Sequence, residues 1–221
     1  MGSLKACFSI DAHCRAGLLA LTLFIVAVYD RLAGFYDRAF APFERRFLEK
    51  WREETLSMLP REGTILEIGA GTGANFKFYP AACRAFSTEL SIKMLEIAAG
   101  KTSGNSLIQA DARFLPFGEN EFDAAFATLV FCSIPDPPKA FAEIRRVVKP
   151  GGKIILLEHV RPPGLLGRFF DVLNVITVFL IDDHFNRRTA VLAANSGLAV
   201  EQVRRKARGA VNLIICNNPA A

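Results

Sequence analysis

The residues with the clearest chemical potential are three acids and a glycine-rich loop. Glu67 lies two positions before the loop Gly69–Gly73, which has glycine at every second position, and Glu89 and Asp111 follow farther along the chain. Glycine has no Cβ, so such a loop turns tightly and lets a ligand come close to the backbone. Together with Ala74 the loop also satisfies the relaxed dinucleotide-binding pattern G-x-G-x-x-G/A. The loop alone therefore does not decide between a dinucleotide, another nucleoside and a plain turn.

The three acids separate these alternatives. The carboxylate of Glu67 would lie close to the pyrophosphate of a dinucleotide and repel it, whereas it suits a ligand that carries an ammonium group. Glu89, 16 residues beyond Gly73, is placed to accept hydrogen bonds from both ribose hydroxyls, as the acid of nicotinamide enzymes also does. Asp111 is placed to meet an adenine amino group. Acids at the ends of three successive strands predict a cationic nucleoside amino acid, S-adenosylmethionine, as the ligand.

An alternation of strands and helices provides the frame for these residues. Pro42 opens a predicted amphipathic helix, residues 42–59. Beyond it, short apolar runs alternate with helical patterns, and residues 149–152 are predicted as a turn. The predicted strands are 64–69, 83–90, 106–111, 122–131 and 153–160, and the predicted helices between them are 91–100, capped by Ser91, and 137–148. Such an alternation predicts an α/β domain with a mostly parallel sheet and helices on both faces.

The C-terminal part of the chain has a different pattern. Residues 165–181 form a strongly apolar predicted helix that either packs on the sheet or meets a membrane. Asn186 is expected to cap the next helix, residues 187–197. Residues 199–207 and 210–217 are predicted to close the sheet as an antiparallel hairpin.

The order of these motifs resembles that of class I S-adenosylmethionine-dependent methyltransferases over about residues 60–160. The matching stretches are the glycine loop with Glu67, Glu89, "ADARFLPF", "FDAAFATLVFCSIPDP" and "RRVVKPGGKIILLEHV". Within that superfamily, "GTGANFKFYP", "TLVFCSI" and "LEHV" resemble the membrane-associated thiol methyltransferases of the methyltransferase-like group. The early "YDRLAGFYD" is similar to quinone-biosynthesis and bacterial phospholipid N-methyltransferases. One departure is Glu89, where relatives often carry Asp.

The resemblance implies a Rossmann-like class I methyltransferase fold: a mostly parallel seven-stranded sheet, a C-terminal antiparallel hairpin, and helices on both faces. It divides the chain into an N-terminal extension and cofactor lid, residues 1–41, and a methyltransferase domain, residues 42–221. It also implies a site for S-adenosylmethionine, with S-adenosylhomocysteine as the product. The residues assigned to that site are Glu67, Gly69, Ala70, Gly71, Thr72, Gly73, Asn75, Glu89, Leu90, Met94, Asp111, Ala112, Arg113, Thr128, Leu129 and Cys132.

The candidate catalytic residues are His159, Tyr36 and Asp183. Methyl transfer from a sulfonium is an in-line displacement that requires no metal, so the protein has mainly to align the reactants and exclude water. Ligands of open α/β sheets lie beyond the carboxyl ends of the strands, which makes His159 the best candidate for a base or acceptor-orienting group, with a structural histidine as the open alternative. Asp182, Asp183 and His184 either line the acceptor pocket or only end the apolar helix. The resemblance places Tyr36 over the methionine end of the cofactor, with a packing role as the alternative.

Composition and charge limit the partners. Five scattered cysteines without CxxC or Cys/His metal spacing indicate a reduced, intracellular protein, and Cys132 either faces the sulfonium or is a buried thiol. The net charge is +5, and residues 184–221 hold six arginines and lysines against the single acid Glu201. No nucleic-acid-binding motif accompanies them, so a solvated face or a membrane surface is expected, not nucleic acid. We expect a monomer.

Residues 16–29 form a charge-free apolar segment. These 14 residues fall short of the ~20 that a helix needs to cross a bilayer. A retained interfacial anchor is favoured over a core helix that covers the domain and over a cleaved signal peptide. The expected location is therefore intracellular and membrane-associated.

The sequence thus predicts a methyltransferase that acts on a lipophilic or amphipathic small molecule. A thiol acceptor is favoured over a phospholipid amine, such as phosphatidylethanolamine, and over a quinone precursor. A nicotinamide-dependent oxidoreductase is the first alternative, but the chain has no Tyr-x-x-x-Lys pair. The second is a non-catalytic, membrane-bound adaptor, which would not need intact glycine and acid motifs.

Overall fold

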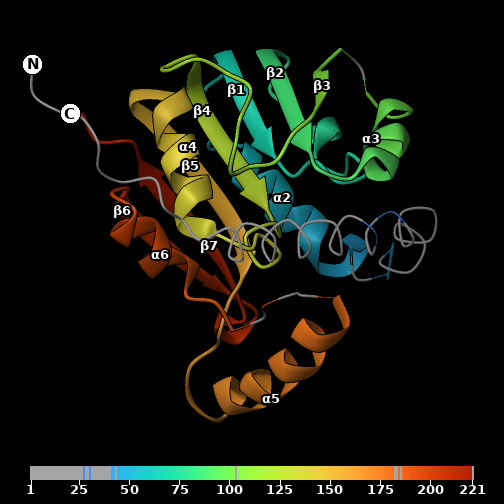
Figure 1. Ribbon diagram of the computed structural model, residues 1–221, viewed down its shortest axis with the longest axis vertical. Helices are drawn as coiled ribbons and strands as arrows, with labels where there is room; N and C mark the ends of the chain where they lie inside the picture. The colour runs from blue at the N-terminus through green and yellow to red at the C-terminus, as the bar shows by residue number, and fades with distance from the viewer. Residues whose placement is uncertain are drawn as a thin grey trace, which may run out of the picture.

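The computed structural model describes residues 27, 30, 41–42, 44–102, 104–181, 184 and 186–220 (Figure 1). The predictions made for residues 16–29, apart from residue 27, and for Tyr36, Asp182 and Asp183 lie outside this part of the chain. The described residues form an open sheet with helices on both faces.

The sheet has seven strands in the order β3-β2-β1-β4-β5-β7-β6. Their bounds are β1 Glu62–Ile68, β2 Ala82–Glu89, β3 Ser106–Gln109, β4 Phe122–Thr128, β5 Val148–His159, β6 Ala199–Lys206 and β7 Val211–Asn217. Neighbouring strands are parallel, except that β7 is antiparallel to both β5 and β6. The predicted mostly parallel, seven-stranded sheet with a closing antiparallel hairpin is confirmed.

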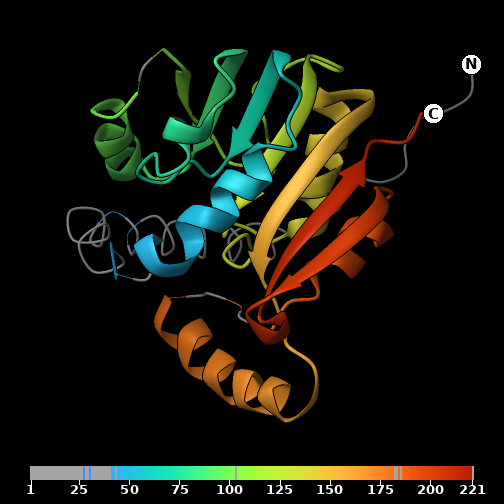
Figure 2. The ribbon, with the colours of Figure 1, turned by 180° about the vertical axis from the view of Figure 1, so that it is seen from behind.

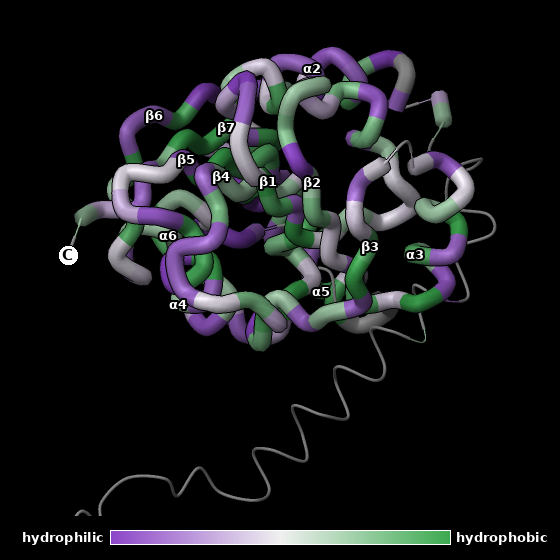
Figure 3. The backbone as a smooth tube through the Cα atoms, turned by 90° about the horizontal axis from the view of Figure 1, so that it is seen from above, coloured by the Kyte–Doolittle hydropathy of each residue, from purple (hydrophilic) through white to green (hydrophobic). Residues whose placement is uncertain are grey.

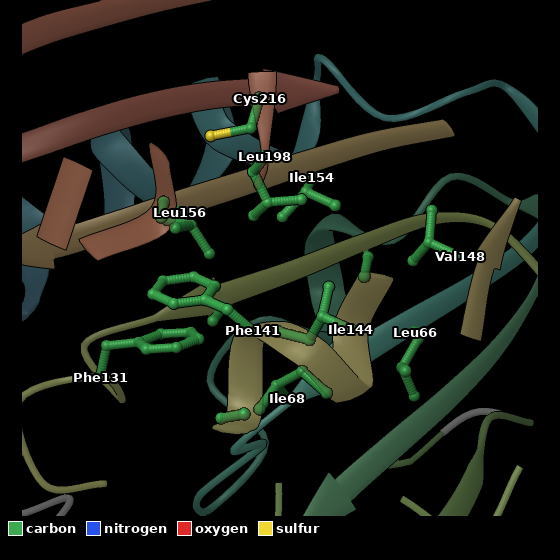
Figure 4. Packing of buried hydrophobic residues seen from close by; sticks show 14 of the residues in the cluster. Leu66, Ile68, Phe131, Phe141, Ile144, Val148, Ile154, Leu156, Leu198 and Cys216 are labelled. Atoms are coloured by element: carbon green, nitrogen blue, oxygen red, sulfur yellow. The ribbon is translucent and has the colours of Figure 1, made fainter. Parts of the chain in front are cut away.

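The helices cover the sheet because its central strands are apolar and buried on both sides, as the green stretches of Figure 3 show. On one face, Phe141 and Ile144 of α4 pack with Leu156 of β5 and with Phe131. The rings of Phe131 and Phe141 are stacked, with centroids 4.2 Å apart (Figure 4). The helical segments are η1 Glu44–Leu48, α2 Glu49–Leu56, η2 Phe76–Phe78, α3 Ile92–Ala99, α4 Pro137–Val147, α5 Gly164–Ile181, α6 Thr189–Asn195 and η3 Ala207–Gly209.

The opposite face of the sheet is covered by α2. Leu56 of α2 belongs to one buried cluster with Ile65 of β1 and Phe126 of β4. This packing fixes α2 across the two strands from which the loops of the candidate site emerge.

Helix α5 is not packed against either face of the sheet. It lies beyond the carboxyl ends of β4 and β5, at the bottom of the view in Figure 1, and Figure 2 shows the same separation from behind. The helix predicted over 165–181 is thus confirmed. Of the two alternatives predicted for it, packing on the sheet is wrong. None of the helices described here combines the length and apolarity required to cross a membrane.

Local predictions for helix ends and turns had mixed outcomes. Ser91 caps α3, since its Oγ accepts a 3.2 Å hydrogen bond from the Met94 N–H. The prediction that Asn186 caps α6 is wrong: the residue before α6 is Arg188 without a side-chain cap. The Asn186 N–H instead donates to Oδ1 of Asn174 in α5, at 3.3 Å.

Residues 149–152 are not a separate turn but part of β5. The Gly151 N–H donates to the Asn218 carbonyl at 2.7 Å, and the Asn218 N–H donates to the Gly152 carbonyl at 2.9 Å. These bonds extend the ladder with the end of β7, which explains why a proline- and glycine-containing stretch stays in the strand.

Candidate active site

A pocket opens where the order of the sheet reverses. β1 is flanked by β2 on one side and by β4 on the other, so the loops that leave β1 and β4 diverge and leave a crevice at the carboxyl ends of the strands. The pocket is open to solvent at its mouth, and its space, counted together with the solvent there, amounts to about 1070 Å³. It is lined by the ends of β1, β2, β3 and β4 with the loops that follow them, and by Arg52 of α2.

Most of the residues assigned to the cofactor line this pocket. They are Gly69, Ala70, Gly71, Thr72, Glu89, Leu90, Met94, Asp111, Ala112, Arg113, Thr128 and Leu129. Glu67, Gly73, Asn75 and Cys132 are assigned residues that lie outside the lining.

The glycine-rich loop needs its glycines for different reasons. All three have positive φ: +67° at Gly69, +55° at Gly71 and +82° at Gly73. A Cβ on Gly69 would come within 2.6 Å of the Val130 side chain, and one on Gly73 within 2.6 Å of Phe76. A Cβ on Gly71 would meet no atom within 4 Å. Gly71 therefore borders open space, and a ligand can approach its backbone there.

Glu89 ends β2 against this loop. Its Oε2 accepts a hydrogen bond from the Gly71 N–H at 2.8 Å, and its Oε1 accepts one from the Ser91 N–H at 2.9 Å. Ser91 in turn donates to Asp30, at 2.5 Å. Burial raises the pKa of Glu89, although the two N–H groups act in the opposite direction.

Asp111 and Arg113 form a pair at the end of β3. Two nitrogens of the Arg113 guanidinium bind the Asp111 carboxylate, with the shortest contact at 2.6 Å, and the Arg113 N–H donates to Oδ1 at 2.9 Å. Arg113 is buried, whereas Asp111 is partly exposed. The pair fixes the orientation of a carboxylate that remains accessible from the pocket.

Glu67 lies behind the pocket and does not line it. It is fully buried, its Oε1 accepts a 2.5 Å hydrogen bond from Asn75, and its Oε2 accepts one from the Tyr79 hydroxyl. Burial raises the pKa of Glu67, while these hydrogen bonds and the charge of Arg52 lower it. The same Asn75 amide donates to Oγ1 of Thr128 at 2.8 Å, so the buried carboxylate reaches the pocket wall through Asn75.

Arg52 is a pocket residue that the sequence did not reveal. Its guanidinium donates to Oδ1 of Asn75 at 3.0 Å and to Oγ1 of Thr128 at 2.5 Å, and it forms an ion pair with Glu44 at 2.8 Å. The side chain is buried but lines the pocket. Its position three residues after Glu49 in an amphipathic helix resembles that of any surface cation, so only the packing of α2 on the sheet identifies it.

The backbone at Leu129 is strained. Leu129 has φ +60°, a value that bulky L-residues rarely adopt, and its N–H donates to the Leu157 carbonyl at 2.7 Å. Together with Thr128 it lines the pocket. Strain of this kind persists only where the surroundings enforce it, as at ligand sites.

The remaining predicted residues of the described chain lie at the end of β5 and in the loop after β4. His159 ends β5, is half-buried and lies outside the pocket lining. The preceding Glu158 is fully buried, and its Oε1 accepts hydrogen bonds from the N–H groups of Val130 and Phe131, at 3.0 and 3.2 Å. Cys132 is also buried. Glu158 thus shapes the loop after β4, and His159 stands beside it on the opposite face of the strand.

The segment after α5 is fastened to the same loop. The His184 N–H donates to the Cys132 carbonyl at 3.0 Å, and the Arg187 guanidinium donates to the carbonyls of Phe131 and Ile134, the latter at 2.6 Å. Ile134 lines the pocket. Of the predicted cluster 182–184, only His184 belongs to the described residues.

These features fit S-adenosylmethionine. The open space over Gly71 accepts a ligand close to the backbone, and the carboxylates of Glu89 and Asp111 follow one another along the wall at the ends of adjacent strands. Arg52 adds a cation at the end of the pocket near Thr128. Ribose hydroxyls, an adenine amino group and a carboxylate find complementary partners in these three side chains.

Comparisons with known proteins find methyltransferases. Residues 66–156 match the family model of a methyltransferase domain. The chain is 36% identical over 140 residues to thiol S-methyltransferase TMT1B of Rattus norvegicus, which covers 60% of this chain and 57% of the relative. It is 30% identical over 142 residues to demethylmenaquinone methyltransferase of Renibacterium salmoninarum, which covers 62% of this chain and 60% of the relative.

A solved structure supports the same fold along nearly the whole chain. A SAM-dependent methyltransferase of Thermotoga maritima, described as a possible histamine N-methyltransferase, has a TM-score of 0.69 and 25% identity, and the alignment covers 88% of this chain and 99% of that one. The alignments with the two curated relatives are shorter, and in each the chain spans less than two thirds of the relative's length.

Proposed function

We propose that this chain, which contains a class I S-adenosylmethionine-dependent methyltransferase domain, methylates the sulfur of a lipophilic small-molecule thiol. The observation that carries the proposal is the pocket itself: the glycine loop and the acids form one side, and the loop after β4, joined to the apolar α5 region, forms the other. The thiol S-methyltransferase of Rattus norvegicus is a relative at 36% identity, which favours a thiol over other acceptors.

The residues of the pocket would bind and orient the methyl donor. Glu89 would accept hydrogen bonds from the ribose hydroxyls and Asp111 one from the adenine amino group, while Arg52 would pair with the carboxylate of the amino-acid end. Glu67 would act from behind, by holding Asn75 and Thr128 in place. When bound, S-adenosylmethionine supplies an electrophilic methyl group on a sulfonium. The protein contributes alignment and the exclusion of water.

On the acceptor side the chain has to produce a thiolate. The acceptor sulfur forms a bond to the methyl carbon as the bond from that carbon to the sulfonium sulfur breaks, and the thiol proton passes to a base. We assign this role to His159, which ends the strand that leads toward α5. Tyr36 remains a proposal for covering the methionine end of the cofactor, and Asp183 for lining the acceptor pocket.

A lipophilic acceptor also implies a lipid surface from which it is drawn. We propose peripheral membrane association of an intracellular protein, in keeping with the apolar segment 16–29 and the exposed apolar residues of α5.

The decisive experiment is transfer of a labelled methyl group from S-adenosylmethionine to three acceptors in parallel. These are an alkyl thiol, phosphatidylethanolamine in vesicles, and a demethylated quinol. We expect labelling of the thiol, and loss of that labelling in the Glu89→Ala variant, with Glu96→Ala on the exposed side of α3 as the matched control. Labelling of the quinol alone would replace the thiol proposal by the activity named for the Renibacterium relative. Binding of S-adenosylhomocysteine without transfer to any acceptor would favour a non-catalytic role.

A further inference from the structure

Helix α5 turns its polar side toward the protein. Gly167, Asp171 and Asn174 recur at helical spacing on this inner side. A Cβ on Gly167 would lie 2.4 Å from the Pro162 carbonyl oxygen, so the helix approaches the backbone closely there. Asp171 is bound by the Arg161 guanidinium at 2.7 Å, and Asn174 accepts the hydrogen bond from Asn186. The polar groups of α5 are thus used to attach the helix to the domain.

The outer side of α5 is apolar and exposed. Leu165, Phe169, Val172 and Val175 repeat at intervals of three and four residues, which places them on one face. Their exposed fractions are 80%, 62%, 66% and 70%. A surface helix of a water-soluble protein ordinarily has the reverse arrangement, with its apolar face inward. The inner contacts are polar and specific, and rotation of the helix would break them. They therefore keep the apolar face turned away from the domain.

Positive charge lies on α5 itself and near the start of the helix. Arg168 is exposed on α5 itself, beside Phe169. The tip of the β6–β7 hairpin carries Arg205 and Arg208, both exposed, and it touches the start of α5: a Cβ on Gly209 would lie 2.9 Å from Cδ of Pro163. Within the described parts of the chain, no carboxylate forms an ion pair with any of these three arginines. Asp171, bound inward, is the only acid between residues 164 and 181.

We infer that the outer face of α5 and the three arginines beside it form a docking surface for a lipid bilayer that contains anionic lipids. An amphipathic helix lies in the bilayer interface with its apolar side among the acyl chains, and nearby cations interact with anionic headgroups. The arginines supply the complementary charge that selects a bilayer over an uncharged apolar partner. The reason for such docking, delivery of a lipophilic acceptor, rests on the proposed function. Arg187, which follows α5, donates a hydrogen bond to the carbonyl of Ile134 in the pocket wall and so connects this region to the pocket.

The test uses the full chain and a readout confined to α5, because other segments of the chain can also bind lipid. Amide hydrogen exchange is measured with and without vesicles of phosphatidylcholine containing about a fifth phosphatidylserine. We expect slower exchange over residues 164–181 in the presence of vesicles and unchanged exchange over α6. Unchanged exchange over 164–181 while the chain sediments with the vesicles would overturn the inference. Protection that rises with protein concentration in the absence of lipid would also overturn it, because a second copy would then cover the face.

A matched pair of variants isolates the apolar contribution. Val172→Asp places a charge on the outer face of α5, and Val191→Asp places the same charge on α6, where Val191 is 51% exposed. We expect Val172→Asp to weaken vesicle binding by about tenfold or more and Val191→Asp to have little effect. Arg168→Gln and Arg208→Gln should each reduce binding to anionic vesicles by about fivefold and leave binding to neutral vesicles unchanged. Equal binding of the two valine variants contradicts the assignment of this face.

Failure here is distinguishable from failure of the proposed function. Calorimetric binding of S-adenosylhomocysteine and methylation of a short, water-soluble thiol depend on the pocket and not on α5. Loss of vesicle docking with both activities intact would remove the docking surface alone, whereas loss of both activities with docking intact would remove the proposed function.

Discussion

The backbone N–H of Gly71 donates a 2.8 Å hydrogen bond to Oε2 of Glu89. The turn that leaves β1 and the acid that ends β2 are therefore held together by a charge-assisted bond. This contact places a carboxylate beside the one glycine of the loop whose missing side chain leaves open space. Several consequences of this arrangement can be measured.

Gly71→Ala should weaken cofactor binding more than its loss of folding free energy can explain. The new methyl group would occupy the open space in the pocket, so affinity for S-adenosylhomocysteine should fall by about tenfold or more in calorimetry. Gly151→Ala is the control, since Gly151 also has positive φ, +77°, and no atom within 4 Å of an added Cβ, but lies outside the pocket. Both variants should lose about 1–2 kcal/mol of folding free energy. An equal effect of both on affinity would show that strain, not occupancy, is responsible.

Cofactor affinity should decline on mild acidification. Because burial raises the pKa of Glu89 above the usual 4.5, this carboxylate, which we propose accepts the ribose hydrogen bonds, is protonated at a higher pH than an ordinary glutamate. Affinity should therefore be constant near neutral pH and fall as the pH drops through the raised pKa. Calorimetry from about pH 8 to about pH 5 measures this. Glu89→Gln should bind more weakly at neutral pH and show a flatter profile; a decline of the same size in that variant would assign it to another group.

Arg52→Lys should impair the donor side although it keeps the charge. A lysine ammonium cannot reproduce the fork that bonds Asn75, Thr128 and Glu44 at once. We expect an affinity loss of about tenfold for S-adenosylhomocysteine. Arg46→Lys in the preceding turn, at an exposed position, is the control and should bind normally. Normal binding by Arg52→Lys would mean that the guanidinium has no role in holding the ligand.

Alanine substitution of a buried phenylalanine and of an exposed one should change the free energy of unfolding by very different amounts. Phe141 is fully buried and stacked on Phe131, so Phe141→Ala should lower the free energy of unfolding by about 3–5 kcal/mol. Phe169 is 62% exposed on α5, and Phe169→Ala should change it by less than about 0.5 kcal/mol. Denaturant titration compares them. A large loss in Phe169→Ala would show that its ring is covered in solution.

His159→Gln should slow transfer to an alkyl thiol by about a hundredfold in kcat if His159 accepts the thiol proton. The loss should be much smaller with an aromatic thiol, which is already ionised at neutral pH, and the KM for S-adenosylmethionine should not change. Equal losses for both acceptors would make His159 an orienting group.

Most residues assigned to the cofactor line one pocket, because the signals that identified them are local. Glu89 and Asp111 each follow an apolar strand, and the glycine spacing marks the turn, so parallel strands bring them together. Arg52 was not predictable, since its role depends on how α2 crosses β1 and β4. Glu67 was assigned to the cofactor site, but the contacts with Asn75 and Tyr79 that keep it out of the pocket lining depend on tertiary packing.

On the other side of the pocket, sequence patterns were less informative. An apolar helix over 165–181 was predicted, but its orientation depends on the contacts of Arg161 with Asp171 and of Asn186 with Asn174. No sequence pattern indicates these pairs. Asn186 resembles a helix cap in sequence because Asn is favoured there. In the fold the Asn186 N–H instead donates to the side-chain oxygen of Asn174. A tertiary contact thus overrides the local preference for capping.

The order of elements along the chain separates the pocket from α5. Every residue that lines the pocket lies between Arg52 and Pro135, whereas α5 and the segment that fastens it begin after the matched methyltransferase region has ended. A chimera that exchanges only residues 161–188 with a relative would therefore leave every residue that lines the pocket unchanged. Under the proposed function, such an exchange separates inheritance of the acceptor from inheritance of the methyl donor.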